Sequence, residues 1–176
     1  LSLHDALPIY GRHRQLMRSA MAVAKEVGTI ISLDGGAQRY DEDMKPITEA
    51  SHIVIVARDY AEKYTGTTNL EEACRIIHER GACIAGVTDG ANGSYFVWPD
   101  GTFYRCEPFT QATVVDTTGA GDSFHGAFLA NLVHTINHMK GQDTTSTTKH
   151  DRASIHAVEL LKACAHSEIG RASCRE

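Results

Sequence analysis

The stretch Asp-Thr-Thr-Gly-Ala-Gly-Asp at residues 116–122 decides the fold and carries most of the functional information in the sequence. It follows a β-rich stretch at 112–115 and precedes apolar residues that fit one face of a helix. This order predicts a strand, a glycine-rich turn and a helix. Gly119 and Gly121 let the backbone turn sharply and approach a ligand closely. Because the first N–H groups of a helix lack partners within it and favour an anion, the turn predicts a phosphate site.

Asp122 places a carboxylate in this predicted phosphate site. It would repel a phosphate unless it had another task, and deprotonating a hydroxyl that attacks phosphorus is such a task. A structural alternative is that Asp122 is only a capping acid, because Asp is common in the first turns of helices. From these residues alone, both interpretations stay open with equal weight.

Residues 116–129, DTTGAGDSFHGAFL, resemble the C-terminal signature of the ribokinase-like, or PfkB-type, carbohydrate kinases. The resemblance implies that an ATP γ-phosphoryl group passes to a primary alcohol of a sugar, with Mg²⁺ and, in several members, K⁺. It also implies that Asp122 is the catalytic base. The other implied site residues are Gly119, Ala120 and Gly121 for the anion hole, and Asp116 and Thr118 for the monovalent cation.

A second segment, Val-Thr-Asp-Gly-Ala-Asn-Gly at residues 87–93, follows one apolar run and precedes another. Taken alone, it favours an ordinary glycine turn between strands. It is similar to the T-x-G-x-x-G stretch that lines the nucleotide site in the same family, which implies that Thr88, Gly90 and Gly93 are nucleotide-binding. Asp89 departs from the apolar residue that usually stands at its position.

A third segment departs further from the family pattern. Many members carry N-x-x-E after a strand, where it helps to organise magnesium and phosphates. Here the strand predicted at 53–56 is followed by Ala-Arg-Asp-Tyr at 57–60, without the asparagine or the glutamate. This puts the usual magnesium-organising role in doubt. Together with Ser-Leu-Asp-Gly-Gly at 32–36, it resembles the ketohexokinase-like branch.

The two ends of the chain are unlike the rest. Residues 1–9 and 169–176 can be encoded by one DNA segment and its reverse complement, and that segment resembles a common short-read sequencing adapter. We therefore expect both ends to be translated adapter that packs irregularly. Residues 10–168 would then be a partial PfkB-type kinase domain, the C-terminal half of an incomplete ribokinase-like fold. Such a piece is expected to be inactive alone, because the sugar-contacting loops and lid lie upstream.

Helical and strand-like patterns alternate along residues 10–168, which predicts an α/β fold with a mostly parallel sheet and helices on both faces. Helices are expected at 15–27, from 57 to about 64, at 68–79, from 122 to about 138 and at 153–165, with a capping box at 68–71 and a polar loop at 141–149. Strands are expected at 29–33, 53–56, 83–87 and 95–98. Ligands of such sheets bind at the carboxyl ends of the strands.

The bulk composition limits the partners. A net charge of −5 and a pI near 6.0 argue against a nucleic-acid-binding face, and the apolar stretches are too short to cross a membrane. Cys74, Cys83, Cys106 and Cys164 fit buried free thiols in a reducing compartment, the cytoplasm. His134 and His138 are spaced for zinc but lack a third ligand, and His125 is better explained by packing or exposure.

The resulting hypothesis is an ATP-dependent sugar kinase, and a homodimer is the expectation for its complete form. Two alternatives remain. The first is a nucleoside kinase of the adenosine type with the same fold, because its signature is nearly the same. The second is a catalytically silent ribokinase-like protein used in regulation or assembly. The intact Asp122 and glycine turn argue against this second alternative.

Overall fold

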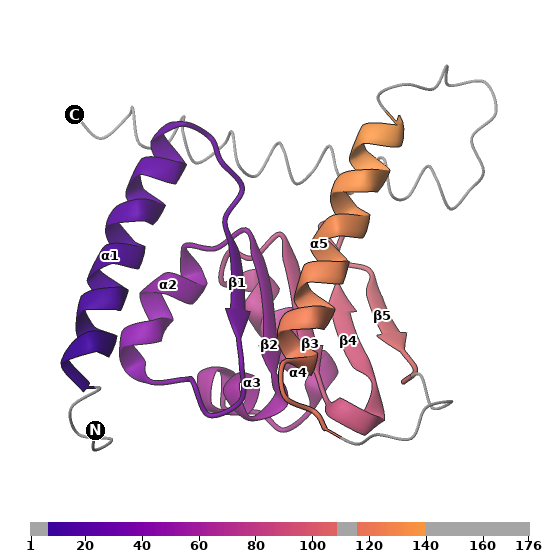
Figure 1. The fold of residues 1–176 in the computed structure, drawn as a ribbon. Helices are drawn as coiled ribbons and strands as arrows, with labels where there is room; N and C mark the ends of the chain where they lie inside the picture. The colour runs from indigo at the N-terminus through magenta and orange to yellow at the C-terminus, as the bar shows by residue number, and fades with distance from the viewer. Residues whose placement is uncertain (1–6, 109–115, 140–176) are drawn as a thin grey trace.

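A computed structural model of the chain describes residues 7–108 and 116–139. They form one five-stranded sheet in the order β1-β2-β3-β4-β5 (Figure 1). The strands are β1 (Ser32–Gly35), β2 (Ile53–Ala57), β3 (Ile84–Thr88), β4 (Ser94–Val97) and β5 (Phe103–Cys106). The helices are α1 (Leu7–Glu26), α2 (Lys45–Glu49), α3 (Arg58–Thr65), α4 (Leu70–Glu79) and α5 (Ala120–Met139), with short 3₁₀ turns at Glu42–Met44 and Gly90–Asn92.

The sheet is parallel in one half and antiparallel in the other. β1, β2 and β3 run parallel, with Leu33 opposite Val54 and Val54 opposite Ala85. β3, β4 and β5 pair antiparallel, because the short connections between them leave no room for the crossover that a parallel pair needs. The expected α/β fold is thus confirmed, while β5 and α2 were not predicted. The strand expected at 112–115, the loop at 141–149 and the helix at 153–165 lie outside the described residues.

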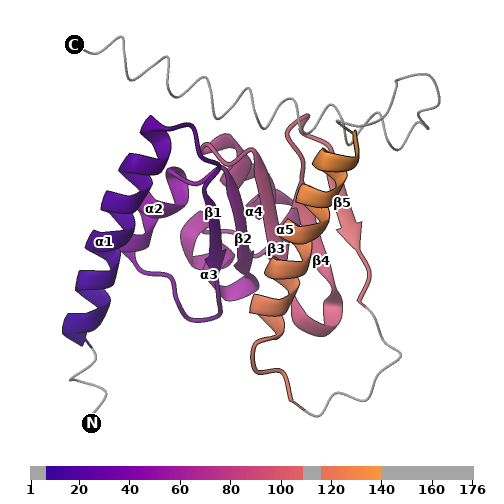
Figure 2. The same cartoon turned by 45° about the horizontal axis from the view of Figure 1, so that its top comes forward.

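Helices cover both faces of the sheet, as expected. α3 and α4 lie behind the sheet in Figure 1 and α5 crosses its front, an arrangement that the turned view of Figure 2 also shows. Alternation along β2 explains the two layers, because successive side chains of a strand point to opposite faces. Val54 and Val56 join the cluster under α3 and α4, whereas Ile53 and Ile55 join the cluster under α5.

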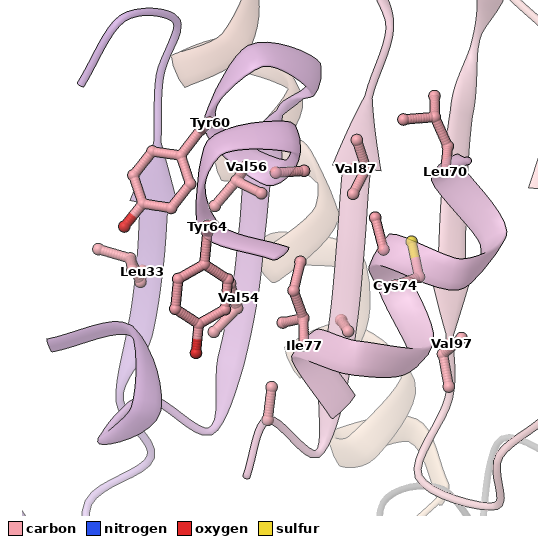
Figure 3. Close-up of a cluster of buried hydrophobic side chains, with 14 of the residues drawn as sticks. Leu33, Val54, Val56, Tyr60, Tyr64, Leu70, Cys74, Ile77, Val87 and Val97 are labelled. Carbon is pink, nitrogen blue, oxygen red and sulfur yellow. The ribbon is translucent and has the colours of Figure 1, made fainter. Parts of the chain in front are cut away.

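The larger core cluster lies between β1–β4 and the helices α3 and α4 (Figure 3). Tyr60 of α3, one of its members, is fully buried. Its hydroxyl lies 2.7 Å from Thr48 Oγ1, and Thr48 Oγ1 donates to the Met44 carbonyl at 2.9 Å. Thr48 therefore accepts from Tyr60, so this buried phenol is satisfied at its hydroxyl.

The smaller cluster fixes α5 on the sheet. Phe96 of β4 stacks on Phe128 of α5 with ring centroids 5.3 Å apart and planes inclined by 4°. A Cβ at Gly86 of β3 would collide with the Phe96 ring. Glycine at this strand position therefore leaves the space into which Phe96 lies, and Phe96 in turn forms the surface on which α5 packs.

Two sequence-based details need correction. The cap of α4 is Asn69 and not Thr68, because the Asn69 side chain accepts hydrogen bonds from the N–H groups of Glu71 and Glu72. The apolar positions expected along the first helix do not form a core face either. Leu16, Val23 and Val27 are 68%, 59% and 70% exposed. In the described part of the chain, α1 is instead tied to the loop before α2 by ion pairs from Arg14 to Asp41 and Asp43.

The described residues include only part of the termini and only some of the cysteines. α1 begins at Leu7, whereas residues 1–6 and 169–176 lie outside the described residues, so the adapter hypothesis stays a prediction. Cys74 and Cys83 are buried free thiols, as expected, whereas Cys106 is exposed on the outermost strand and contradicts the expectation. Cys164 is outside the described residues.

No helix among the described residues is long and apolar enough to span a membrane.

We expect stability to fall in mild alkali. Burial raises the pKa of Tyr60 from 10.0 to about 12 and the pKa of Cys74 from 9.0 to about 12. The folded state therefore holds both protons more tightly, an advantage that is complete below pH 9 and is lost as the pH rises towards 12. Urea unfolding at several pH values should show the fall, and Tyr60→Phe should make it shallower above pH 10. A flat profile from pH 9 to 12 would contradict the expectation.

Candidate functional site

The glycine-rich turn at residues 116–119 leads directly into α5. Asp116 Oδ1 accepts hydrogen bonds from the Thr118 N–H at 2.8 Å and from Thr118 Oγ1 at 2.9 Å, which shapes the turn. Gly119 follows with a φ of 74°, in the left-handed region that glycine adopts without strain. The turn and the first helical residues through Ser123 are exposed, except for the partly exposed Gly119.

The backbone N–H groups at the start of α5 are arranged as a helix N-terminus requires. The Ala120 N–H donates to the Thr117 carbonyl at 3.1 Å, and the Ser123 N–H donates to the Gly119 carbonyl at 2.9 Å. Between them, the N–H groups of Gly121 and Asp122 belong to the first turn, where the helix itself supplies no acceptor. Of the predicted anion-hole residues, Ala120 thus has its N–H engaged, and Gly121 has its N–H at the open end.

Gly119 and Gly121 have different conformations, although both were expected to line the anion hole. Only Gly119 has a positive φ, whereas Gly121 is helical. A Cβ built on Gly121 would have no heavy atom within 4 Å among the described residues. The space next to Gly121 is therefore open, so a ligand could approach the backbone there.

Asp122 projects an exposed carboxylate from the first turn of α5. Its Oδ2 lies 4.0 Å from the position that a Cβ on Gly119 would take, so it stands beside the turn. Within residues 7–108 and 116–139, no hydrogen bond ties this carboxylate to a backbone N–H. A side chain that capped the helix would make such a bond, so the geometry favours a carboxylate that is available to a ligand.

Asp116 and Thr118 were predicted to hold a monovalent cation. Two hydrogen bonds from Thr118 lower the pKa of Asp116; the bond from its N–H has the larger effect and the bond from its hydroxyl the smaller. These bonds favour the ionised carboxylate, the form that attracts a cation. Among the described residues, no group of three or more His, Cys, Asp or Glu side chains is placed to hold a metal ion.

The second predicted loop is the connection between β3 and β4. β3 ends at Thr88, the 3₁₀ turn Gly90–Asn92 follows, and Gly93 leads into β4. Gly90 and Gly93 both have positive φ values, 51° and 94°. A Cβ at Gly93 would also overlap the Cys106 carbonyl of β5. Both glycines are thus required by the turn itself, whether or not they touch a nucleotide.

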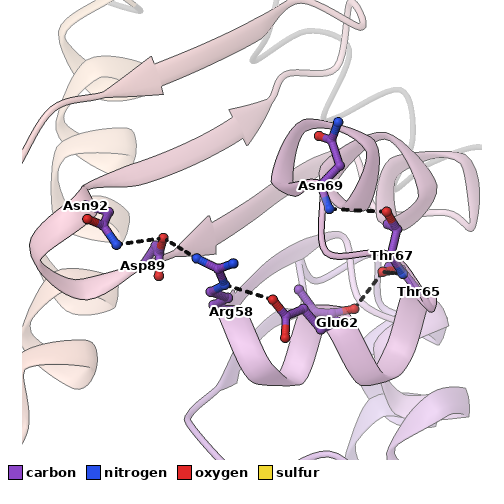
Figure 4. A network of polar contacts seen from close by, with 8 residues as sticks. Arg58, Glu62, Thr65, Thr67, Asn69, Asp89 and Asn92 are labelled. Carbon is purple, nitrogen blue, oxygen red and sulfur yellow. Dashed lines mark hydrogen bonds and ion pairs between the residues drawn. The ribbon is translucent and has the colours of Figure 1, made fainter.

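Sequence reasoning missed a polar network that fixes this loop (Figure 4). Asp89 Oδ2 accepts hydrogen bonds from Arg58 Nη1 at 3.0 Å and from Asn92 Nδ2 at 3.1 Å. Arg58 also donates from Nε to Glu62 at 2.8 Å. Both carboxylates raise the pKa of the Arg58 guanidinium, and the hydrogen bond to Glu62 has the larger effect. The two segments that depart from the family pattern, at 57–60 and at Asp89, are therefore in contact with each other.

The two loops lie at the same edge of the sheet. In Figures 1 and 2, β1 runs towards the end at which α5 begins and at which the β3–β4 turn lies. This is the edge formed by the carboxyl ends of the parallel strands, where ligands of α/β sheets bind. A side chain on α5 also reaches β1, because His125 Nε2 lies 2.9 Å from Ser32 Oγ.

Comparison with known proteins identifies the family of the chain. Residues 8–154 match the profile of the pfkB family carbohydrate kinases. A 5-dehydro-2-deoxygluconokinase of Bacillus subtilis is 32% identical over 115 residues, which are 64% of this chain and 33% of the relative. A cytidine kinase of Thermococcus kodakarensis is 34% identical over 89 residues, which are 49% of this chain and 31% of the relative.

The fold is also that of a solved kinase. A fructokinase double mutant of Vibrio cholerae, solved with fructose, ADP and a potassium ion, aligns with a TM-score of 0.56 and 24% identity. The alignment covers 84% of this chain and 46% of the fructokinase. The chain spans only about a third of the curated relatives, at 33% and 31% of their lengths. The profile match over residues 8–154 nevertheless covers most of the chain, which belongs to the pfkB family of carbohydrate kinases.

Proposed function

We propose that the complete protein transfers the γ-phosphoryl group of ATP to a primary alcohol of a sugar. The observation that carries the proposal is the start of α5. There, a left-handed Gly119, an open space beside Gly121 and an exposed Asp122 carboxylate stand together at the carboxyl edge of the parallel strands. This arrangement offers both an anion site and a base within one helical turn.

Asp122 takes the proton of the acceptor hydroxyl as the hydroxyl oxygen attacks the γ-phosphorus. A new O–P bond forms, the bond from phosphorus to the bridging oxygen of ATP breaks, and ADP leaves with the electron pair of that bond. The N–H groups of Gly119, Gly121 and Asp122 stabilise the negative charge on the transferring phosphoryl oxygens.

The nucleotide is held between two loops in this proposal. Thr88, Gly90 and Gly93 line its site from the β3–β4 turn, and the Arg58–Asp89 pair keeps that turn in place. Mg²⁺ would neutralise charge on the phosphates of ATP, and K⁺ would be held by Asp116 and Thr118. The potassium ion bound in the Vibrio fructokinase structure supports the second ion. The buried thiols of Cys74 and Cys83 favour a reducing compartment such as the cytoplasm.

The acceptor is a sugar in the proposal, because the gluconokinase and the fructokinase are named for sugars. The cytidine kinase relative favours a nucleoside as the second candidate. The test is acceptor-dependent ADP release by the complete protein, with Mg²⁺ and K⁺ present, against ketoses, aldoses, sugar acids and nucleosides. Turnover with a sugar is the expected result. Turnover with nucleosides alone would shift the assignment to the second candidate, and no ADP release with any acceptor would reject both.

We expect the 176-residue chain alone to release no ADP in the same assay. Positioning of acceptor and phosphate supplies much of the rate in phosphoryl transfer, and we place the acceptor contacts in an upstream part of the protein. Two features of the described residues support this view. The strand β1 pairs only with β2, which leaves its other edge open. Apolar side chains in α1 and just after it, those of Leu16, Val23 and Val27, are exposed. Acceptor-dependent ADP release that disappears in Asp122→Asn would show that the chain is self-sufficient.

A further inference from the structure

One polar contact joins α5 to the edge strand β1. His125 is only 8% exposed, and its Nε2 lies 2.9 Å from Ser32 Oγ, a hydrogen bond whose donor depends on the imidazole tautomer. Its Nδ1 is buried without a hydrogen-bond partner among the described residues and faces Asp34 Oδ2 at 4.0 Å. A buried imidazole between two polar residues of one strand is an uncommon way to pack a helix, because apolar contacts would suffice for packing.

The position of His125 along α5 matters because of the residues near it. His125 lies three residues after Asp122, which is about 4.5 Å along a helix axis. Phe128, Leu129 and Leu132, which pack α5 on the smaller cluster, lie further along the helix. Before His125, Phe124 is 38% exposed and stacks on Phe96 with ring centroids 6.2 Å apart. These apolar contacts fix where the helix lies, whereas the His125–Ser32 hydrogen bond is a directional polar contact next to its first turn. The bond from His125 to Ser32 restrains that turn at the end where Asp122 stands.

We propose that His125 is a positioning residue, which holds the first turn of α5 on β1 through Ser32 and thereby sets the direction of the Asp122 carboxylate. The proposal rests on the role assigned to Asp122 above. It requires no contact of His125 with substrate, because the side chain is buried between helix and sheet. Loss of the bond then displaces the base relative to the acceptor hydroxyl. A small displacement at a reacting group can cost a large factor in rate.

The experiment compares four variants of the complete protein. His125→Phe keeps a ring and removes the bond, His125→Gln keeps a polar group near the Nε2 position, and Ser32→Ala removes the partner. The fourth carries Ser32→Ala and His125→Phe together. We expect His125→Phe and Ser32→Ala each to lower kcat about tenfold with little change in KM for ATP, and His125→Gln to recover most of the loss. The double variant should be no worse than His125→Phe, because both changes remove one interaction.

Controls separate this role from simple packing. Asn131→Ala removes a side-chain bond to the Ala127 carbonyl that stays within α5, so its kcat should equal that of the wild type. The thermal midpoint of each variant reports folding, and Ser32→Ala carries the test if His125→Phe does not fold. Wild-type kcat in folded His125→Phe or Ser32→Ala, additive losses in the double variant, or no recovery in His125→Gln would overturn the proposal. If Asp122→Asn keeps full turnover, the proposed function itself fails; if only Asp122→Asn is impaired, the positioning role alone fails.

Discussion

Replacing Asp122 with asparagine in the complete protein is expected to lower kcat by about 10²–10⁴-fold, the range that general-base catalysis contributes. Asparagine keeps the shape of the side chain and removes the group that accepts the proton. The exposed carboxylate makes no hydrogen bond to the backbone among the described residues, so its loss should leave α5 in place. KM for ATP should change little, because the proposed nucleotide contacts are backbone N–H groups and the β3–β4 turn, which this substitution leaves intact.

The measurement is steady-state ADP release at saturating acceptor, together with ATP affinity by calorimetry. Asp116→Asn is a useful companion, because Asp116 sits in the same turn but holds Thr118 and not the acceptor. Its main effect should be on the dependence of rate on K⁺. Wild-type turnover in Asp122→Asn would reject the role of Asp122 as the general base. A loss of folding stability as large as that caused by removing a helix cap would instead support the capping interpretation.

Replacing Gly121 with valine is expected to abolish transfer while the fold survives. The sequence suggested a sharp backbone turn at this glycine, but the structure places the left-handed conformation at Gly119 and leaves open space around Gly121. The expected loss therefore has a different reason. A branched side chain would fill the space beside the N–H groups of the first turn, which the phosphate must reach.

A matched substitution is available on the same helix. Gly126 is also helical, exposed, and free of neighbours within 4 Å of an added Cβ among the described residues. Gly126→Val thus introduces the same side chain one turn beyond the site, and we expect it to retain turnover. Gly119→Val should fail for another reason, backbone strain, and should also lower the thermal midpoint. Equal ADP release by Gly121→Val and the wild type would mean that the phosphate lies elsewhere.

The parts of the site that are local in sequence could be predicted, because their signals are local. The glycine turn before α5 and the turn after β3 depend on residues a few positions apart, and both appear where the sequence placed them. The Arg58–Asp89 pair could not be predicted, because the two residues are 31 positions apart and meet only when β2 and β3 pair. Ser32 and His125, separated by 93 positions, were missed for the same reason.

Other differences arise from tertiary context. Periodicity correctly predicted a helix at the start of the chain, but it could not say what that helix packs against. Leu16, Val23 and Val27 remain exposed, whereas Met21 packs against the larger core cluster. The direction of β4 and β5 follows from the lengths of their connections, which the pattern of alternating helices and strands obscured. The placement of Cys106 depends on its edge strand, which the sequence did not indicate.

Gly86, inside the sheet, affects the position of the catalytic helix α5. It makes no contact with any proposed ligand, yet any side chain there would force the Phe96 ring outwards against Phe128. The displaced ring would lift α5, and the start of that helix carries Asp122. A substitution at Gly86 would therefore lower the measured rate as a substitution in the active site does. Variant screens of this protein should not assume that a residue far from the nucleotide can be replaced without loss of activity.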